Sequence, residues 1–199
     1  MKKVKFIAIL SILTIVSFLL VIACQKNIEQ NNTKNDAKVD TAKKAAESTE
    51  KPPVEEKVLS KAPTFDGINL VDGSQFSLDN MKDHVLIIDF WAPWCPPCRA
   101  EIPGFIELHN QYKDKKFAVI GIAVSAKESD VKKFIAEQKI NYPIIMGTEK
   151  TVMEYGQAMN QDIQAIPTTL IINRKGEIVT VHVGAEDKSK FEKEIQSLF

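Results

Sequence analysis

The sequence predicts an α/β domain in which a central mixed β-sheet is flanked by helices. Two segments rich in β-branched residues predict buried strands: 85–91, which opens with the apolar run 85–88, and 117–124, which reads as a buried parallel strand. Two later runs, 168–172 and 177–183, flank a turn at 173–176 and predict an antiparallel hairpin. Together these runs favour one domain of about 140 residues, which is long enough to bury a proper core.

The remaining elements follow in chain order. Residues 65–78 alternate about the Asp72-Gly73 turn and predict an N-terminal β-hairpin. A helix is expected from the cysteine pair at 95 and 98 to about residue 113. Later elements are a helix capped by Asp130, a short strand at 142–146, a short helix at 152–159 and a closing helix that begins at Asp187.

Composition divides the chain into three parts: a signal segment at 1–23, a tether at 24–60 and the α/β domain at 61–199. Basic and acidic residues number 26 each, so the formal net charge is zero. That balance excludes the basic excess that marks a nucleic-acid-binding protein. The tether lacks aromatic residues and mixes lysines with acidic residues. This composition favours a flexible coil with an average reach of roughly 30 Å.

The N-terminus carries three lysines among its first five residues, followed by an uncharged apolar run that ends in Ala23-Cys24. It resembles a bacterial lipobox, and we therefore expect a lipid anchor on Cys24. An uncleaved signal-anchor helix is the alternative, since about 18 apolar residues just suffice to span a bilayer. Either anchor places the domain outside the cytoplasmic face, in the bacterial cell envelope, where disulfides persist.

Cys95 and Cys98 lie on the turn that leaves the strand at 85–91 and opens a helix. Free backbone N–H groups and the positive end of the helix dipole favour a thiolate on Cys95 at this position. Because the cysteines are one helical turn apart, their sulfurs can form a short-loop disulfide. Pro96 and Pro97 suit the first helical positions, where N–H groups are not needed. The pattern predicts a reversible dithiol.

Two other interpretations of the cysteine pair are weaker. A zinc site needs two further ligands, but there is no second cysteine pair, and His84, His109 and His182 stand at no ligand spacing. A purely structural disulfide that closes so short a loop would stabilise the fold little.

The segment 89–99, Asp-Phe-Trp-Ala-Pro-Trp-Cys-Pro-Pro-Cys-Arg, resembles the active-site segment of the thioredoxin superfamily. Residues 166–168, Ile-Pro-Thr, resemble the cis-proline loop of that family. Residues 62–65 and 98–103 are similar to the membrane-tethered TlpA/ResA branch. The resemblance covers about 60–199 and implies a thioredoxin-like fold with an N-terminal hairpin and an insertion before the cis-proline loop.

The resemblance also implies roles for individual residues. Cys95, the more exposed cysteine in this family, attacks the target disulfide, and Cys98 resolves the mixed disulfide. Either Asp89 or Glu101 accepts the proton of Cys98. The alternative for Asp89 is a structural acid held by hydrogen bonds. The alternative for Glu101 is an ordinary solvated residue of the helix. Three further residues, Trp94, Ile166 and a cis Pro167, would contact the substrate. No cofactor is implied beyond the redox-active disulfide.

The function expected from this resemblance is reduction of disulfides in exported proteins, apocytochrome c included, with electrons from a membrane protein of the CcdA/DsbD type. A thiol peroxidase of the same superfamily is an alternative, although such enzymes carry threonine where this chain has Ala92. A copper chaperone of the Sco type would need a wider cysteine spacing and a distant histidine, for which His182 is the one late candidate. A lipoprotein with an inert disulfide is the non-enzymatic alternative.

Overall fold

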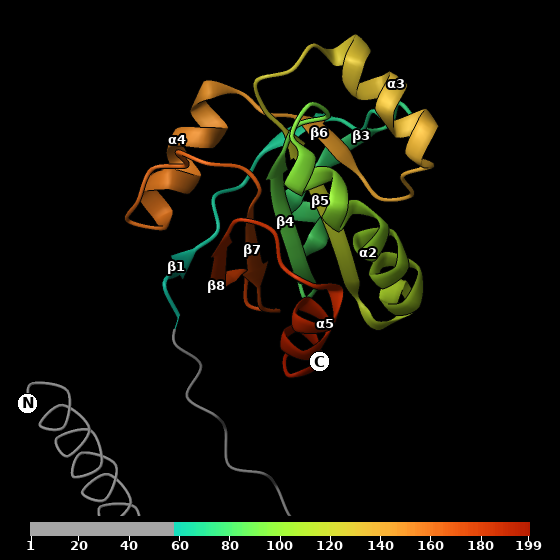
Figure 1. The fold of residues 1–199 in the computed structure, drawn as a ribbon. Coiled ribbons are helices and arrows are strands. Elements are labelled where there is room, and N and C mark those ends of the chain that lie inside the picture. Colours follow the sequence, from blue (N-terminus) through green and yellow to red (C-terminus); the bar gives the residue numbers. More distant parts are fainter. Residues whose placement is uncertain (1–57) are drawn as a thin grey trace, which may run out of the picture. The chain divides into compact units, whose positions relative to one another are not determined.

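The computed structural model describes residues 58–199 (Figure 1). The expected signal segment, Cys24 and nearly all of the tether lie outside the described residues. Ser60, expected at the end of the tether, already belongs to the sheet through strand β1. Within residues 58–199 no helix is both long enough and apolar enough to cross a membrane.

The central sheet has six strands in the order β1-β8-β7-β4-β5-β6. Strands β4, β5 and β6 run parallel, whereas β7 pairs antiparallel with β4, β8 with β7 and β1 with β8, which confirms the expected mixed sheet. The strands are β1 (Ser60–Lys61), β4 (Val85–Trp91), β5 (Phe117–Ala123), β6 (Ile144–Met146), β7 (Thr168–Ile172) and β8 (Glu177–Val183).

Strand β4 lies inside the sheet, and all seven of its residues are buried. Alternate side chains of a strand point to opposite faces, so its residues divide between two apolar clusters. Val85, Ile87 and Trp91 pack with residues from α2 (Pro96–Tyr112), α3 (Glu128–Gln138) and α5 (Lys188–Gln196). Leu86, Ile88 and Phe90 pack on the other face with α4 (Glu149–Ala158) and β3 (Gln75–Ser77). This alternation turns Asp89 toward the face that α2 and α5 cover (Figure 1).

The N-terminal hairpin forms as expected, from β2 (Asp66–Ile68) and β3, but as a separate two-stranded sheet. The side-chain oxygen of Asn69 links it to the central sheet by accepting the backbone N–H of Ile144 at 3.2 Å. Two short 3-10 helices, η2 (Leu78–Met81) and η3 (Lys113–Lys115), precede β4 and β5. The insertion expected before the cis-proline loop consists of α3, β6 and α4.

Two helix starts differ from the expectation. Helix α3 begins at Glu128 after Lys127, so Asp130 lies in its first turn and does not cap it; the backbone N–H of Asp130 bonds to the Lys127 carbonyl. Helix α4 begins at Glu149 because the Thr148 hydroxyl accepts the backbone N–H of Thr151, a side-chain cap that the apolar spacing does not reveal.

Candidate active site

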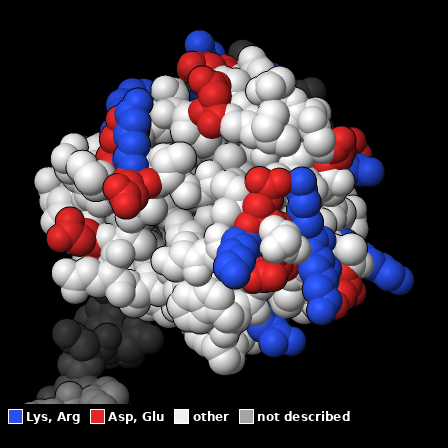
Figure 2. Space-filling view, turned by 90° about the horizontal axis from the view of Figure 1, so that it is seen from above, with Lys and Arg blue, Asp and Glu red and all other residues white. Residues whose placement is uncertain are grey.

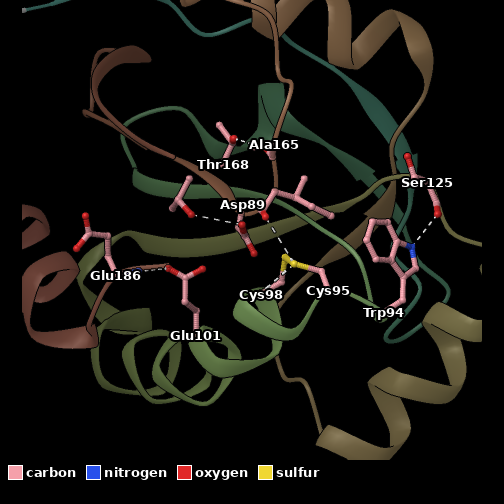
Figure 3. The surroundings of a disulfide bond; sticks show 11 residues. Asp89, Trp94, Cys95, Cys98, Glu101, Ser125, Ala165, Thr168 and Glu186 are labelled. Atoms are coloured by element: carbon pink, nitrogen blue, oxygen red, sulfur yellow. Dashed lines mark hydrogen bonds between the residues drawn. A yellow bond between two sulfur atoms is a disulfide. The ribbon is translucent and has the colours of Figure 1, made fainter. Parts of the chain in front are cut away.

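A disulfide joins Cys95 and Cys98 where β4 gives way to α2 (Figure 3). Cys95 is the N-cap residue of α2, and the two prolines that follow occupy the first helical positions. Because proline has no N–H, the first backbone donor of the helix is that of Cys98, which donates to the Cys95 sulfur at 3.3 Å. The strand-to-helix turn therefore brings the two sulfurs together as the sequence predicts.

Both cysteines are buried. Cys95 keeps 2% of its surface exposed and Cys98 none, so Cys95 is the more accessible of the two. Pro96, Pro97 and Trp94 around them are exposed. A partner therefore meets this rim before it reaches the Cys95 sulfur.

The cis-proline loop faces the disulfide. The peptide bond between Ile166 and Pro167 is cis, and the Ile166 carbonyl oxygen lies 3.7 Å from the Cys95 sulfur. Ile166 is half-buried and Pro167 is buried. Two expected substrate-binding residues thus lie directly beside the redox centre.

Trp94 is the most exposed aromatic residue of the site, with 60% of its surface accessible. Its indole N–H donates to the Ser125 carbonyl at 2.9 Å, which fixes the ring over the loop after β5 (Figure 3). Figure 2, seen from the end of the molecule above the sheet, shows groups of charged side chains separated by a broad uncharged area. An oriented, exposed indole can contact the apolar part of a polypeptide.

Asp89 lies in β4 beneath the disulfide, 1% exposed. Its Oδ1 accepts the Thr169 hydroxyl at 3.3 Å, whereas Oδ2 is buried without a hydrogen-bond partner. Burial, and second the nearby Glu101, raise the pKa of Asp89 well above its usual value, while the Thr169 hydroxyl opposes the shift. Such a carboxyl group is ready to hold a proton.

Glu101 lies one turn beyond Cys98 on α2 and is 5% exposed, so it is not a solvated helix residue. Its Oε1 accepts the backbone N–H of Glu186 at 2.7 Å, and its Oε2 is buried without a partner. Burial raises the pKa of Glu101 to about 7, against the lowering effect of the Glu186 N–H. A carboxyl group with this pKa can exchange a proton near neutral pH.

The structure also brings in residues that sequence patterns do not single out: Thr169, beside Asp89, and Glu186, beside Glu101. Thr169 is the register partner of Asp89, so pairing β7 with β4 would have found it. No sequence pattern marks the Glu186 backbone.

His182, the late histidine considered above as a copper ligand, bonds to Glu194. Among residues 58–199 no group of three or more His, Cys, Asp or Glu side chains is placed to hold a metal ion.

Comparisons with known proteins agree with this geometry. The model of the Redoxin family matches residues 57–195. The thioredoxin-like protein YneN of Bacillus subtilis is 31% identical over 137 residues, which cover 68% of this chain and 76% of that protein. The thiol-disulfide oxidoreductase ResA of Halalkalibacterium halodurans is 30% identical over 115 residues, 57% of this chain and 62% of that protein.

Solved structures show the same similarity. A thioredoxin-family thiol:disulfide interchange protein from Chlorobium tepidum superposes with a TM-score of 0.66 at 33% identity, covering 70% of this chain and 95% of that one. A putative DsbE from the same organism gives 0.63 at 30% identity, covering 70% and 96%. This chain belongs to the Redoxin family and is a thiol-disulfide oxidoreductase of the TlpA/ResA-like group with a thioredoxin-like fold.

Proposed function

We propose that this oxidoreductase reduces disulfides in exported proteins, on the extracytoplasmic side of the membrane. One observation carries the reducing direction. The Cys95 sulfur receives a single backbone N–H, from Cys98, because Pro96 and Pro97 supply none. Dithiols that act as oxidants are those whose reduced form is strongly stabilised, and few donors at Cys95 mean a modest stabilisation of its thiolate.

The reaction begins with the Cys95 thiolate. It attacks one sulfur of the client disulfide, forms a mixed disulfide and expels the other client sulfur as a thiolate. The client's extended backbone lies along the cis-proline loop, where Ile166 is half-buried and its carbonyl borders the Cys95 sulfur. Trp94 supplies apolar contact at the rim.

Cys98 then releases the client. Its proton passes to the buried acids, where Asp89 and Glu101 each keep one carboxyl oxygen without a hydrogen-bond partner. The Cys98 thiolate attacks the Cys95 sulfur, closes the Cys95–Cys98 disulfide and expels the second client thiolate, which takes up a proton. The client leaves with two thiols, and the enzyme has given up two electrons.

The oxidised enzyme must be recharged. We assign this step to a membrane dithiol donor of the CcdA/DsbD type, which the domain would reach through the expected lipid anchor on Cys24 and the expected tether at 24–60. Apocytochrome c, whose cysteines must be reduced before haem attachment, is the proposed client. Support for both comes from the resemblance to the TlpA/ResA branch and from the lipobox-like N-terminus.

Trapping tests the proposal. In cells that produce full-length Cys98→Ala, the mixed disulfide on Cys95 cannot be resolved, and mass spectrometry identifies the captured proteins. Recovery of cytochrome apoproteins supports the proposed client, whereas a broad mixture points to general disulfide repair. The matched control, Cys95→Ala with Cys98→Ala, should capture nothing. If both variants capture the same proteins, Cys95 is not the attacking thiol.

A further inference from the structure

One short segment, residues 184–187 between β8 and α5, touches two parts of the site. The backbone N–H of Gly184 donates to the Pro167 carbonyl at 2.9 Å, so the segment supports the cis-proline loop. Two residues later the backbone N–H of Glu186 donates to the Glu101 carboxylate at 2.7 Å (Figure 3). A displacement of this segment would therefore change the surroundings of both Pro167 and Glu101.

His182 secures this segment from inside the fold. Its ring, 8% exposed, donates from Nε2 to the Glu194 carboxylate of α5 at 2.9 Å. Its Nδ1 lies 3.7 Å from Oε1 of Glu186, a contact that is an ion pair when the ring carries a proton on both nitrogens, and the ring packs edge-on against Phe191 of α5 at 5.4 Å. One imidazole thus contacts the segment at one nitrogen and the helix after it at the other.

His182 also lies on the same face of the sheet as Asp89. Thr169 is the register partner of Asp89 across β4 and β7, and of His182 across β7 and β8. Cross-strand partners of an antiparallel pair point to the same face. Asp89, Thr169 and His182 therefore form a row of polar side chains on the face of the sheet that α2 and α5 cover. Asp89 is at one end of the row, and His182, which contacts the segment 184–187, is at the other.

We propose that His182 is a positioning residue: by holding Glu186 in place, it keeps the Glu101 carboxyl group hydrogen-bonded and turned toward the disulfide. This inference rests on the proposed role of Glu101 as proton acceptor. His182 itself touches neither a sulfur nor a client. It acts through the backbone of residue 186.

The direction of the expected effect follows from the contacts of Glu101. Burial raises the pKa of Glu101, the Glu186 N–H lowers it, and repulsion from the Glu186 carboxylate raises it by less than the N–H lowers it. Loss of the whole contact between Glu186 and Glu101 therefore raises the pKa of Glu101 further. Two other ionisable groups interact with Glu101: Asp89 and Tyr142, whose pKa values the Glu101 charge raises. Glu194 bonds to His182, and Lys190 bonds to the Glu186 carboxylate at 2.5 Å.

Titration of the Glu101 carboxyl carbon by NMR tests the inference. The oxidised, full-length protein is labelled at its glutamate side chains, and the Glu101 signal is identified by its loss in Glu101→Gln. In His182→Leu the midpoint should rise by about 0.5 pH unit or more, which is about a threefold change in the ratio of ionised to protonated Glu101. His182→Gln, which keeps a donor toward Glu194, should restore most of the wild-type midpoint.

Two further variants keep the test decisive. Glu194→Ala removes the partner of His182 from a partly exposed helix position, so the fold should tolerate it, and the midpoint should rise as in His182→Leu. Glu186→Gln keeps the backbone N–H but removes the carboxylate, so the midpoint should fall. An unchanged midpoint in folded Glu194→Ala or His182→Leu overturns the inference, as does a rise in Glu186→Gln. The titration needs no client, so the trapping experiment and this one fail separately.

Discussion

Asp89, from strand β4, and Glu101, from helix α2, lie beside the same disulfide (Figure 3), and each keeps one buried carboxyl oxygen without a hydrogen-bond partner. The two carboxyl groups lie close enough to each other that the charge of Glu101 raises the pKa of Asp89. Two carboxyl groups in one apolar site disfavour double ionisation. The site is therefore built to keep a proton near Cys98 at neutral pH.

This pair makes stability depend on pH. Burial raises the pKa of Glu101 to about 7 from its ordinary value of 4.5, so the folded protein binds a proton that the unfolded chain has lost. The free energy of unfolding should fall as pH rises through that window, by on the order of 3 kcal/mol for Glu101 alone. Urea unfolding of the oxidised protein at pH 5 and pH 8 measures it. Glu101→Gln should show a clearly smaller fall, and an equal fall would mean that Glu101 is not its source.

Asp89→Asn should separate stability from activity. Removing a buried carboxyl group that has one oxygen without a hydrogen-bond partner should raise the free energy of unfolding at pH 8 by about 1–3 kcal/mol. Resolution by Cys98 should slow at least tenfold, because a positioned base typically contributes about 10²-fold or more. Stopped-flow measurement of mixed-disulfide decay gives the rate. The exposed Asp79→Asn is the matched control and should change neither quantity; a stable Asp89→Asn protein with a wild-type rate would remove Asp89 from the mechanism.

Thr169→Val removes the hydroxyl that donates to Asp89 at 3.3 Å while keeping the side-chain volume. Since that hydrogen bond lowers the pKa of Asp89, its loss should raise it, and the pH profile of Cys98 resolution should move to higher pH. Thr168→Val is the control, because its hydroxyl bonds to the Ala165 carbonyl instead. Equal profiles for wild type and Thr169→Val would show that Asp89 does not titrate in this step.

Trp94→Ala tests the docking surface. The indole is 60% exposed, so its loss should leave the free energy of unfolding within about 1 kcal/mol of wild type. Catalytic efficiency toward a protein disulfide should fall about tenfold, as for an aromatic contact worth roughly 1.4 kcal/mol. A small disulfide should be reduced almost as before. Met153→Ala, at a 61% exposed position on α4, serves as control, and an equal loss there would mean that the effect is not specific to the site.

The sequence could predict the elements that local pattern determines. The strand Val85–Trp91 is found to the residue because it opens with the apolar run 85–88 and the cysteine pair follows it closely. The hairpin strands Thr168–Ile172 and Glu177–Val183 are likewise correct, since β-branched residues flank a turn. By contrast, the two-residue strand β1 carries no pattern, because it exists only through pairing with Ile178 and Glu177 far along the chain.

The site can be predicted from the sequence only in part, because some of its contacts join residues that are far apart in the chain. Cys95 and Cys98 lie on the strand-to-helix turn and Asp89 lies in the strand just before it, so the local sequence places all three near one another. Glu101 accepts a backbone N–H that lies 85 residues away in the sequence, and no local sequence pattern predicts such a donor. His182 is an isolated histidine in the sequence until β8 is placed beside β7 and α5 above it. Long-range packing, which residue spacing does not encode, supplies these contacts.

The proposed function requires that Cys95 and Cys98 form a reversible dithiol of reducing character. Equilibration of the full-length protein against glutathione buffers, followed by acid quenching and thiol alkylation, measures the two-electron midpoint potential. We expect complete interconversion, with both cysteines alkylated together, and a midpoint well below the value of about −120 mV typical of a strong oxidant such as DsbA. Thiols that fail to interconvert, or a midpoint near that of the oxidant, would contradict a reducing dithiol.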